Sequence, residues 1–72
     1  MKRSHGIRPY NARLRDMQAR YGSKELKGYD LYNAVLNCFY YHRLGLFDTA
    51  RVLNHTVDEI ESAISIIEQN AQ

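Results

Sequence analysis

Cys38 and His42 are the residues in this sequence that come nearest to a chemical site, because they stand four positions apart. On a helix that spacing puts both on one face, where a thiolate and an imidazole can bind a metal or form a nucleophilic couple. A structural zinc site needs four ligands, however, and the other histidines, His5 and His55, are distant in the sequence. The sequence shows no third group to orient the imidazole, no glycine-rich phosphate loop and no His-Glu-x-x-His motif. We therefore expect no catalytic residue, no metal and no cofactor, and we expect Cys38 to be buried.

The length of the chain limits what it can do. Its 72 residues are 44% apolar and 25% charged, which is typical of a folded domain with a small core. Such a core leaves little room for an enclosed substrate pocket, so we expect a protein that is not an enzyme. A single cysteine forms no internal disulfide, and no apolar run approaches about 20 residues. These features predict a cytoplasmic protein without a membrane span.

Charge is divided unevenly along the sequence. Residues 1–30 contain eight Lys or Arg against three Asp or Glu, a net charge of +5. Residues 31–72 contain two against five, a net charge of −3. We expect the two halves to bind different partners, or each other. Residues 1–8 are predicted to be a flexible basic arm, and residues 9–72 a single helical domain.

The first predicted helix is marked by its ends and by its apolar face. Pro9 suits a first helical turn, where its missing N–H is tolerated, and Gly22 with Ser23 is predicted to end the helix. Apolar side chains recur between these ends at the spacing of one helix face, at Tyr10, Leu14, Met17 and Tyr21.

A central helix is predicted over about residues 31–44, with Asp30 as its N-cap and Gly45 as its end. It is apolar on two sides, so we expect it to pack between other elements. One face holds Leu31, Val35, Cys38, Phe39 and His42, and the far side holds Leu36, Tyr40 and Leu44.

Two further helices are predicted near the C-terminus. A short one is capped by Asp48 and ends near Leu53, and a longer one runs from about Val57 to Gln69. Because no segment alternates as a strand does, we predict an all-α domain of four helices. The buried stripe of the last helix is Val57, Ile60, Ala63, Ile64 and Ile67, with Ile66 just beyond its edge.

The segment between these two helices has the spacing of a sharp corner. Ala50 is a small residue at which two helices can touch, and Ile60, ten positions later, would return the second helix to the core beside Leu53. Asn54 stands at the turn, where a left-handed backbone is needed and Asn tolerates it. Thr56 is predicted to cap the last helix in a capping box with the glutamate three residues later.

Residues 46–65 thereby resemble the helix-turn-helix superfamily of DNA-binding domains, within a helix-turn-helix-like segment at 46–69. In that pattern a small residue is followed four positions later by Gly and ten positions later by Val or Ile, which correspond here to Ala50, Asn54 and Ile60. His55 departs from it, because the family usually has Val or Ile there. The alternative is a plain bend between two helices of a small bundle.

The resemblance implies a transcriptional regulator whose second helix enters the DNA major groove. A monomer of this size reads few base pairs, so the resemblance favours a homodimer formed through Ile66 or exposed tyrosines. The basic arm and first helix would contact phosphates, and hydroxyl side chains of the last helix would lie nearest the bases. The residues expected to contact DNA are Lys2, Arg3, Arg8, Arg13, Arg20, Arg43, Arg51, Thr56, Ser62 and Ser65.

Tyrosines offer the basic half a second way to bind nucleic acid. Tyr10, Tyr21 and Tyr29 are interleaved with its Lys and Arg residues. Aromatic rings placed among cations can stack on unpaired bases, which would suit RNA or a single DNA strand.

The charge of the last helix favours a different function. It has no Lys or Arg, and its carboxylates recur along one face, where a phosphate backbone would be repelled. The alternative hypothesis is therefore a protein-interaction module that binds a basic surface of the transcription machinery, as an accessory or phage-type modulator. The residues expected to form that protein-binding surface are Asp58, Glu61, Glu68, Tyr40, Tyr41 and Ile66.

Overall fold

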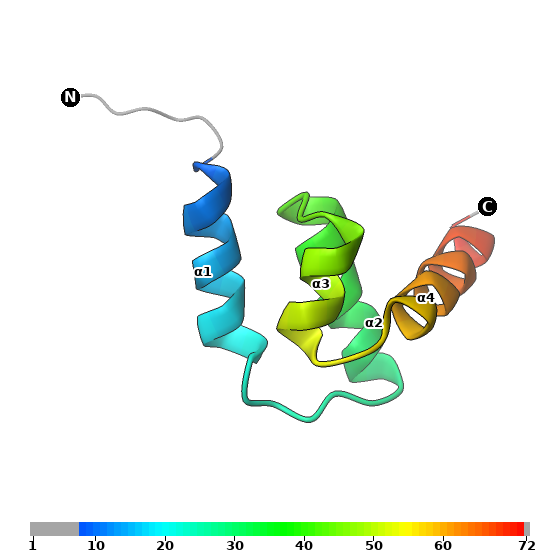
Figure 1. Cartoon of the computed structure of the whole chain (residues 1–72). Coiled ribbons are helices and arrows are strands. Elements are labelled where there is room, and N and C mark those ends of the chain that lie inside the picture. Colours follow the sequence, from blue (N-terminus) through cyan, green and yellow to red (C-terminus); the bar gives the residue numbers. More distant parts are fainter. Residues whose placement is uncertain (1–7, 72) are drawn as a thin grey trace.

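The computed structural model describes residues 8–71, and within that range the regular structure is entirely helical. Helix η1 is a π-helix that continues α2 without a break, so the chain forms four helices, as the sequence predicted (Figure 1). The elements are α1 (Tyr10–Tyr21), α2 (Tyr29–Val35), η1 (Leu36–Tyr41), α3 (Leu46–Leu53) and α4 (Val57–Asn70).

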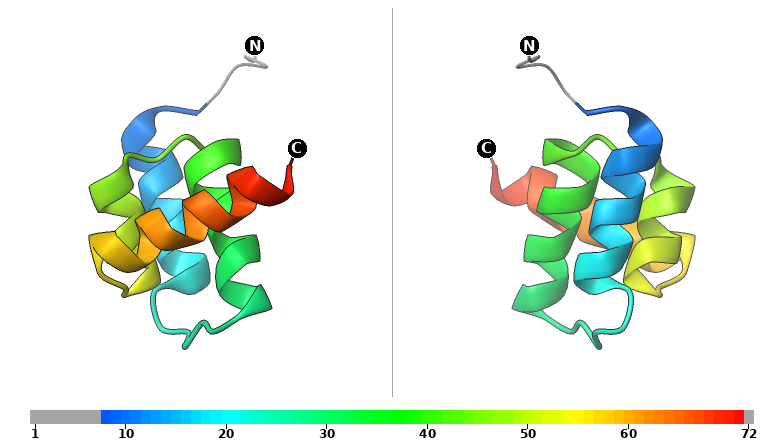
Figure 2. Two further views of the ribbon diagram at one scale, coloured as in Figure 1. Left: turned by 90° about the vertical axis from the view of Figure 1, so that its right-hand side faces the viewer. Right: turned by 90° about the vertical axis from the view of Figure 1, so that its left-hand side faces the viewer.

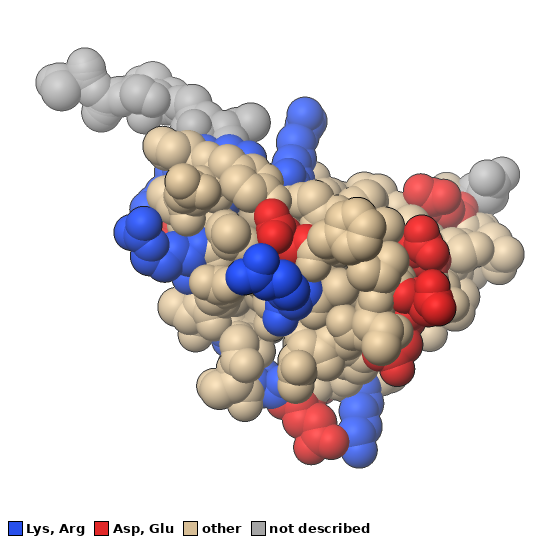
Figure 3. All heavy atoms as spheres, in the orientation of Figure 1, with Lys and Arg blue, Asp and Glu red and all other residues tan. Residues whose placement is uncertain are grey.

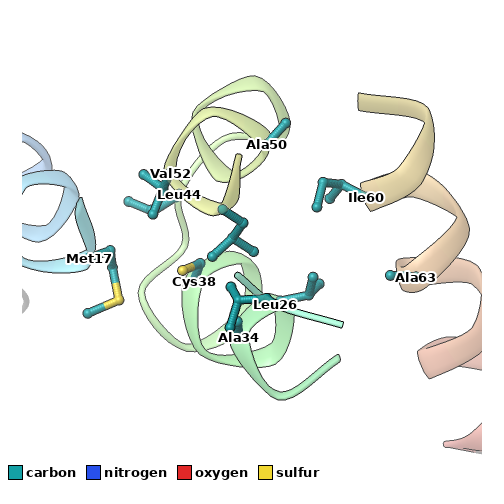
Figure 4. Close-up of a cluster of buried hydrophobic side chains, with 11 residues drawn as sticks. Met17, Leu26, Ala34, Cys38, Leu44, Ala50, Val52, Ile60 and Ala63 are labelled. Carbon is teal, nitrogen blue, oxygen red and sulfur yellow. The ribbon is translucent and has the colours of Figure 1, made fainter. Parts of the chain in front are cut away.

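The helices lie in three layers. Helix α1 lies on one side of a middle layer made by α2, η1 and α3, and α4 crosses the other side of that layer (Figure 2). Met17 of α1 approaches the central core from one side, and Ile60 and Ala63 of α4 approach it from the other (Figure 4). The centre itself is filled by Val35, Cys38, Leu44, Val52 and Leu53, each at most 2% exposed.

Helix α1 has the ends and the face that the sequence predicted. Met17 is buried, and its three apolar neighbours on that face pack against the core. The helix ends at Tyr21, where the Gly22 N–H donates to the Gln18 carbonyl oxygen at 2.8 Å. A Cβ atom at Gly22 would lie 2.5 Å from that oxygen, so only glycine fits this close approach.

The expected N-caps of the next two helices are wrong by two or three residues. Helix α2 begins after Gly28, which has a φ of 56°, and Asp30 lies inside its first turn. Helix α3 begins after Gly45, and Asp48 lies inside its first turn. In both helices a glycine takes the boundary position, and the carboxylate is left where it interacts favourably with the helix dipole.

The central helix also ends earlier than expected, and Arg43 takes the role that the sequence assigned to Gly45. Arg43 has a left-handed backbone with a φ of 57°. This reversal lets the Leu44 N–H donate to the Cys38 carbonyl oxygen at 3.0 Å, and it turns Leu44 into the core.

The π-helical geometry of η1 changes which side chains share a face. The His42 N–H donates to the carbonyl oxygen of Asn37, five residues back, at 2.9 Å. At α-helical spacing Leu36 would share a packed face with Tyr40 and Leu44. Leu44 is indeed buried, but Leu36 is 42% exposed, so the expected burial of Leu36 is wrong.

The corner between α3 and α4 has the predicted geometry. Asn54 is left-handed, with φ 59° and ψ 44°. The Glu59 N–H donates to the Thr56 hydroxyl at 3.1 Å, and the Thr56 N–H donates to the Glu59 carboxylate at 2.9 Å, which completes the capping box. Ala50, Leu53 and Ile60 are all buried, which fixes the angle between the helices.

Candidate interaction surfaces

The exposed face of α4 is acidic, as the sequence predicted. Asp58, Glu61 and Glu68 are exposed, and none of them forms an ion pair with a cation in residues 8–71. Ser62 and Ser65 are exposed on the same helix. Figure 3 shows Asp and Glu side chains gathered on the α4 side of the molecule, while Lys and Arg lie on the α1 side and also in the middle, at the top and at the bottom of the view.

Tyr40 links η1 to this acidic face. Its hydroxyl donates to the Glu68 carboxylate at 3.0 Å. Partial burial, and then this hydrogen bond, raise the pKa of Tyr40, so the hydroxyl keeps its proton. Ile66 is 39% exposed and Tyr40 37% exposed, so two partly open apolar side chains accompany the carboxylates. We call Tyr40, Asp58, Glu61, Ile66 and Glu68 the α4 surface.

Tyr41 faces a different part of the molecule from Tyr40. It is 77% exposed and lines a groove with Arg20 and Asn37, between α1 and η1. The sequence predicted that both tyrosines belong to one protein-binding surface, whereas in the structure Tyr40 contacts Glu68 of α4 and Tyr41 lines this groove.

Several of the cations expected to contact DNA make internal contacts. Arg13 donates from Nε to the His42 carbonyl oxygen at 2.8 Å and also donates to the Arg8 carbonyl oxygen. It therefore ties α1 to the end of η1. Arg8 itself pairs with Asp16 at 3.1 Å, through side chains that stay largely exposed.

The remaining cations expected to contact phosphates differ in whether a carboxylate already pairs with them. Arg51 lies 3.8 Å from Asp48 and is 73% exposed in its side chain, so this ion pair is weak. Arg20 and Arg43 are exposed and pair with no carboxylate of the described residues. Lys2 and Arg3 lie outside the described residues.

Two of the three tyrosines expected to stack on bases are used inside the fold. The Tyr10 hydroxyl donates to the Asp48 carboxylate and accepts from the Gly45 N–H at 3.0 Å. The Tyr21 hydroxyl accepts from the Asn37 amide at 3.0 Å. Both rings pack against the core, so the expectation that they stack on bases is wrong, while Tyr29 is 77% exposed.

His55 makes contacts that the sequence did not reveal. Its Nδ1 lies 3.0 Å from the Glu59 carboxylate, and its Nε2 lies 3.1 Å from the Leu26 carbonyl oxygen. Both partners are acceptors, so a protonated ring satisfies both contacts and a neutral ring satisfies only one. Leu26 is buried, so His55 holds the connection between α1 and α2 against the corner.

Cys38 is wholly buried, as predicted, and burial raises the pKa of its thiol to about 12. It therefore stays a neutral thiol that packs as a small apolar side chain. In residues 8–71 no three His, Cys, Asp or Glu side chains are grouped as a metal ion would require.

No family model, curated protein or solved structure matches this chain. In the described part of the chain, no helix has the length and apolar character needed to cross a membrane. The surfaces of the molecule, and above all the unpaired carboxylates of α4, are therefore the features that bear on function.

Proposed function

We propose that this protein is a non-enzymatic regulatory module that uses the α4 surface to bind a basic region of another protein. The observation that carries the proposal is the set of three exposed carboxylates that form no ion pair within residues 8–71, Asp58, Glu61 and Glu68, on a helix without a single cation. Tyr40, which is hydrogen-bonded to Glu68, and Ile66, on another side of α4 from Glu68, are partly exposed and add apolar contact area.

Unpaired carboxylates favour a partner of opposite charge. Because Asp58, Glu61 and Glu68 pair with no cation of the described residues, Lys or Arg of a partner can pair with them without breaking an internal ion pair. Their combined field also steers a basic partner toward this side of the molecule. A partly exposed tyrosine and a partly exposed aliphatic side chain are residue types that protein interfaces use. A basic surface of the transcription machinery fits these requirements.

Duplex DNA is the second candidate partner. The corner between α3 and α4 favours it, because helix-turn-helix proteins use that geometry to present a recognition helix. Here, however, insertion of α4 into the major groove would bring Asp58 and Glu61 close to phosphates, which repel them. The cations of α1 lie on the other side of the middle layer (Figure 2), whereas Arg51 of α3 lies beside the start of α4 and already pairs with Asp48. Contact with a basic protein therefore ranks first.

Charge reversal tests the proposal. We predict that the Asp58→Lys/Glu61→Lys double variant loses capture by immobilised RNA polymerase core enzyme, the probe chosen for the transcription machinery. The matched control is the Glu25→Lys/Asp30→Lys double variant, which changes the net charge by the same amount. Asp30 lies in the first turn of α2, as Asp58 lies in the first turn of α4.

The control variant should be captured as well as the natural chain. Equal capture of both double variants would contradict the assignment to the α4 surface. No capture of the natural chain would contradict the choice of partner. Circular dichroism of each variant establishes that the helices are retained.

A further inference from the structure

We propose that the groove between α1 and η1 binds single-stranded nucleic acid, with Tyr41 as a stacking platform and Arg20 as a phosphate contact. The groove is shallow and open to solvent, with a volume of about 440 Å³. It does not include the α4 surface, so this proposal is independent of the proposed protein partner. Its lining residues are Arg20, Tyr21, Asn33, Leu36, Asn37 and Tyr41.

The π-helix creates this groove. Its hydrogen bonds join residues five apart, which brings Leu36 and Tyr41 toward the same side of η1. On an α-helix these two side chains would diverge. Short π-helical stretches occur frequently at functional sites, and this one supplies three of the six residues that line the groove.

Tyr41 is placed to stack on an unpaired base. It is 77% exposed, and its ring makes an edge-to-face contact with the His42 ring at 4.9 Å between centroids. This contact fixes the tilt of the ring while most of the residue stays open. Leu36, which is 42% exposed, adds an apolar surface in the same groove. A base that stacks here gains contact area whatever its identity, because every base has a π-face.

Polar groups of the groove match the edge of a base. The Asn37 amide donates to the Tyr21 hydroxyl oxygen, so the Tyr21 O–H remains free to donate in turn. The Asn37 side-chain oxygen remains an acceptor. Asn33 is exposed, and its side chain makes no hydrogen bond within residues 8–71. Donors and acceptors thus stand beside the stacking platform.

Unpaired cations supply the attraction for a phosphate backbone. The Arg20 guanidinium carbon lies 5.6 Å from the centre of the Tyr21 ring, and no carboxylate of the described residues pairs with it. Arg43, two residues after Tyr41, is exposed and has a strained left-handed backbone. Strained residues cluster at binding sites, where the surrounding structure holds them in place.

A single strand fits this groove better than a duplex or an acidic protein. Stacking on Tyr41 requires a base that is not already stacked and paired, and a duplex offers such a base only at its ends. An acidic peptide would pair with Arg20 but would not use the exposed aromatic ring.

Fluorescence anisotropy with labelled oligo-dT and oligo-U tests the proposal on the full chain. We expect Tyr41→Ala to weaken binding about tenfold, the effect of losing one stacked base, and Tyr41→Phe to retain binding. Tyr29→Ala is the matched control, because Tyr29 is also 77% exposed but does not line the groove. Arg20→Gln should weaken binding and reduce its salt dependence more than Arg15→Gln, which changes an exposed α1 cation outside the groove.

Each other outcome would overturn the proposal. Equal losses in Tyr41→Ala and Tyr29→Ala would remove Tyr41 as the platform, and equal affinity for a duplex of matched length would remove stacking as the cause. Displacement of the oligonucleotide by polyglutamate would indicate an anion site without base recognition. Absence of binding to both oligonucleotides would refute a single-strand site.

Discussion

Arg43 and Asn54 are, among the described residues, the two with a left-handed backbone that are not glycine. For Asn54 this conformation is well tolerated, because its short polar side chain suits the left-handed region. Arg43 has no such local compensation, yet its conformation turns the chain so that Leu44 enters the core. The position of Leu44 is therefore obtained at the expense of backbone strain in Arg43.

We predict that Arg43→Gly stabilises the protein by about 1 kcal/mol, because glycine adopts the left-handed conformation without strain. Urea denaturation of the variant and the natural chain measures the difference in the free energy of unfolding. Arg51→Gly is the control: it loses a cation from the interior of α3 and should destabilise by about 1 kcal/mol. A loss of stability in Arg43→Gly would show that the Arg43 side chain makes a stronger contribution than the backbone strain.

Sequence patterns identified residues whose role depends on the neighbouring backbone, and they missed residues whose contacts lie far away in the sequence. Asn54 and Thr56 were predicted correctly, because a left-handed turn and an N-cap are local properties. His55 contacts Leu26, which is 29 positions away, and no spacing rule connects them. Thr49 is wholly buried, and its hydroxyl has no hydrogen-bond partner in the structure, which its place in the sequence did not indicate either.

At the scale of elements, the capping box of α4 is sensitive to pH. The hydrogen bond from the Thr56 N–H, and then the contact with His55, lower the pKa of Glu59 below its ordinary value of 4.5. A carboxyl group whose pKa is lowered by folding stabilises the fold above its unfolded-state pKa. That contribution is lost as the pH falls through the folded-state pKa.

We predict that Glu59→Gln reduces the loss of stability on acidification from about pH 5 to about pH 3. Glutamine can still accept the hydrogen bond from the Thr56 N–H, but it does not titrate. The measurement is the free energy of unfolding in urea at a series of pH values. If the variant lost stability as steeply as the natural chain, Glu59 would not be the titrating group.

Helices themselves were easier to predict than their boundaries and their periodicity. The apolar spacing of α1 and α4 gave the correct buried faces, because both are regular α-helices. The N-caps of α2 and α3 were missed because Gly28 and Gly45 compete for the boundary with Asp30 and Asp48. The π-helix η1 was missed because the spacing of its apolar residues is equally compatible with an α-helix.

At the scale of the whole molecule, the fold converts a gradient of charge along the sequence into two opposed surfaces. Because α1 and α4 lie on opposite sides of the middle layer, the basic first helix and the acidic last helix face away from each other (Figure 2). The sequence predicted unequal halves but left open whether they bind each other. In the structure these two helices are on separate sides, so each is free to meet its own partner.

The most direct test of the proposed function is an NMR titration of the full chain, followed at every backbone amide. We predict that RNA polymerase core enzyme broadens the signals of α4 between Asp58 and Glu68 before those of α1, and that random duplex DNA leaves the α4 signals unchanged. Changes at α4 on addition of duplex DNA, or polymerase effects confined to α1, would contradict the assignment of α4 as a surface for a basic protein.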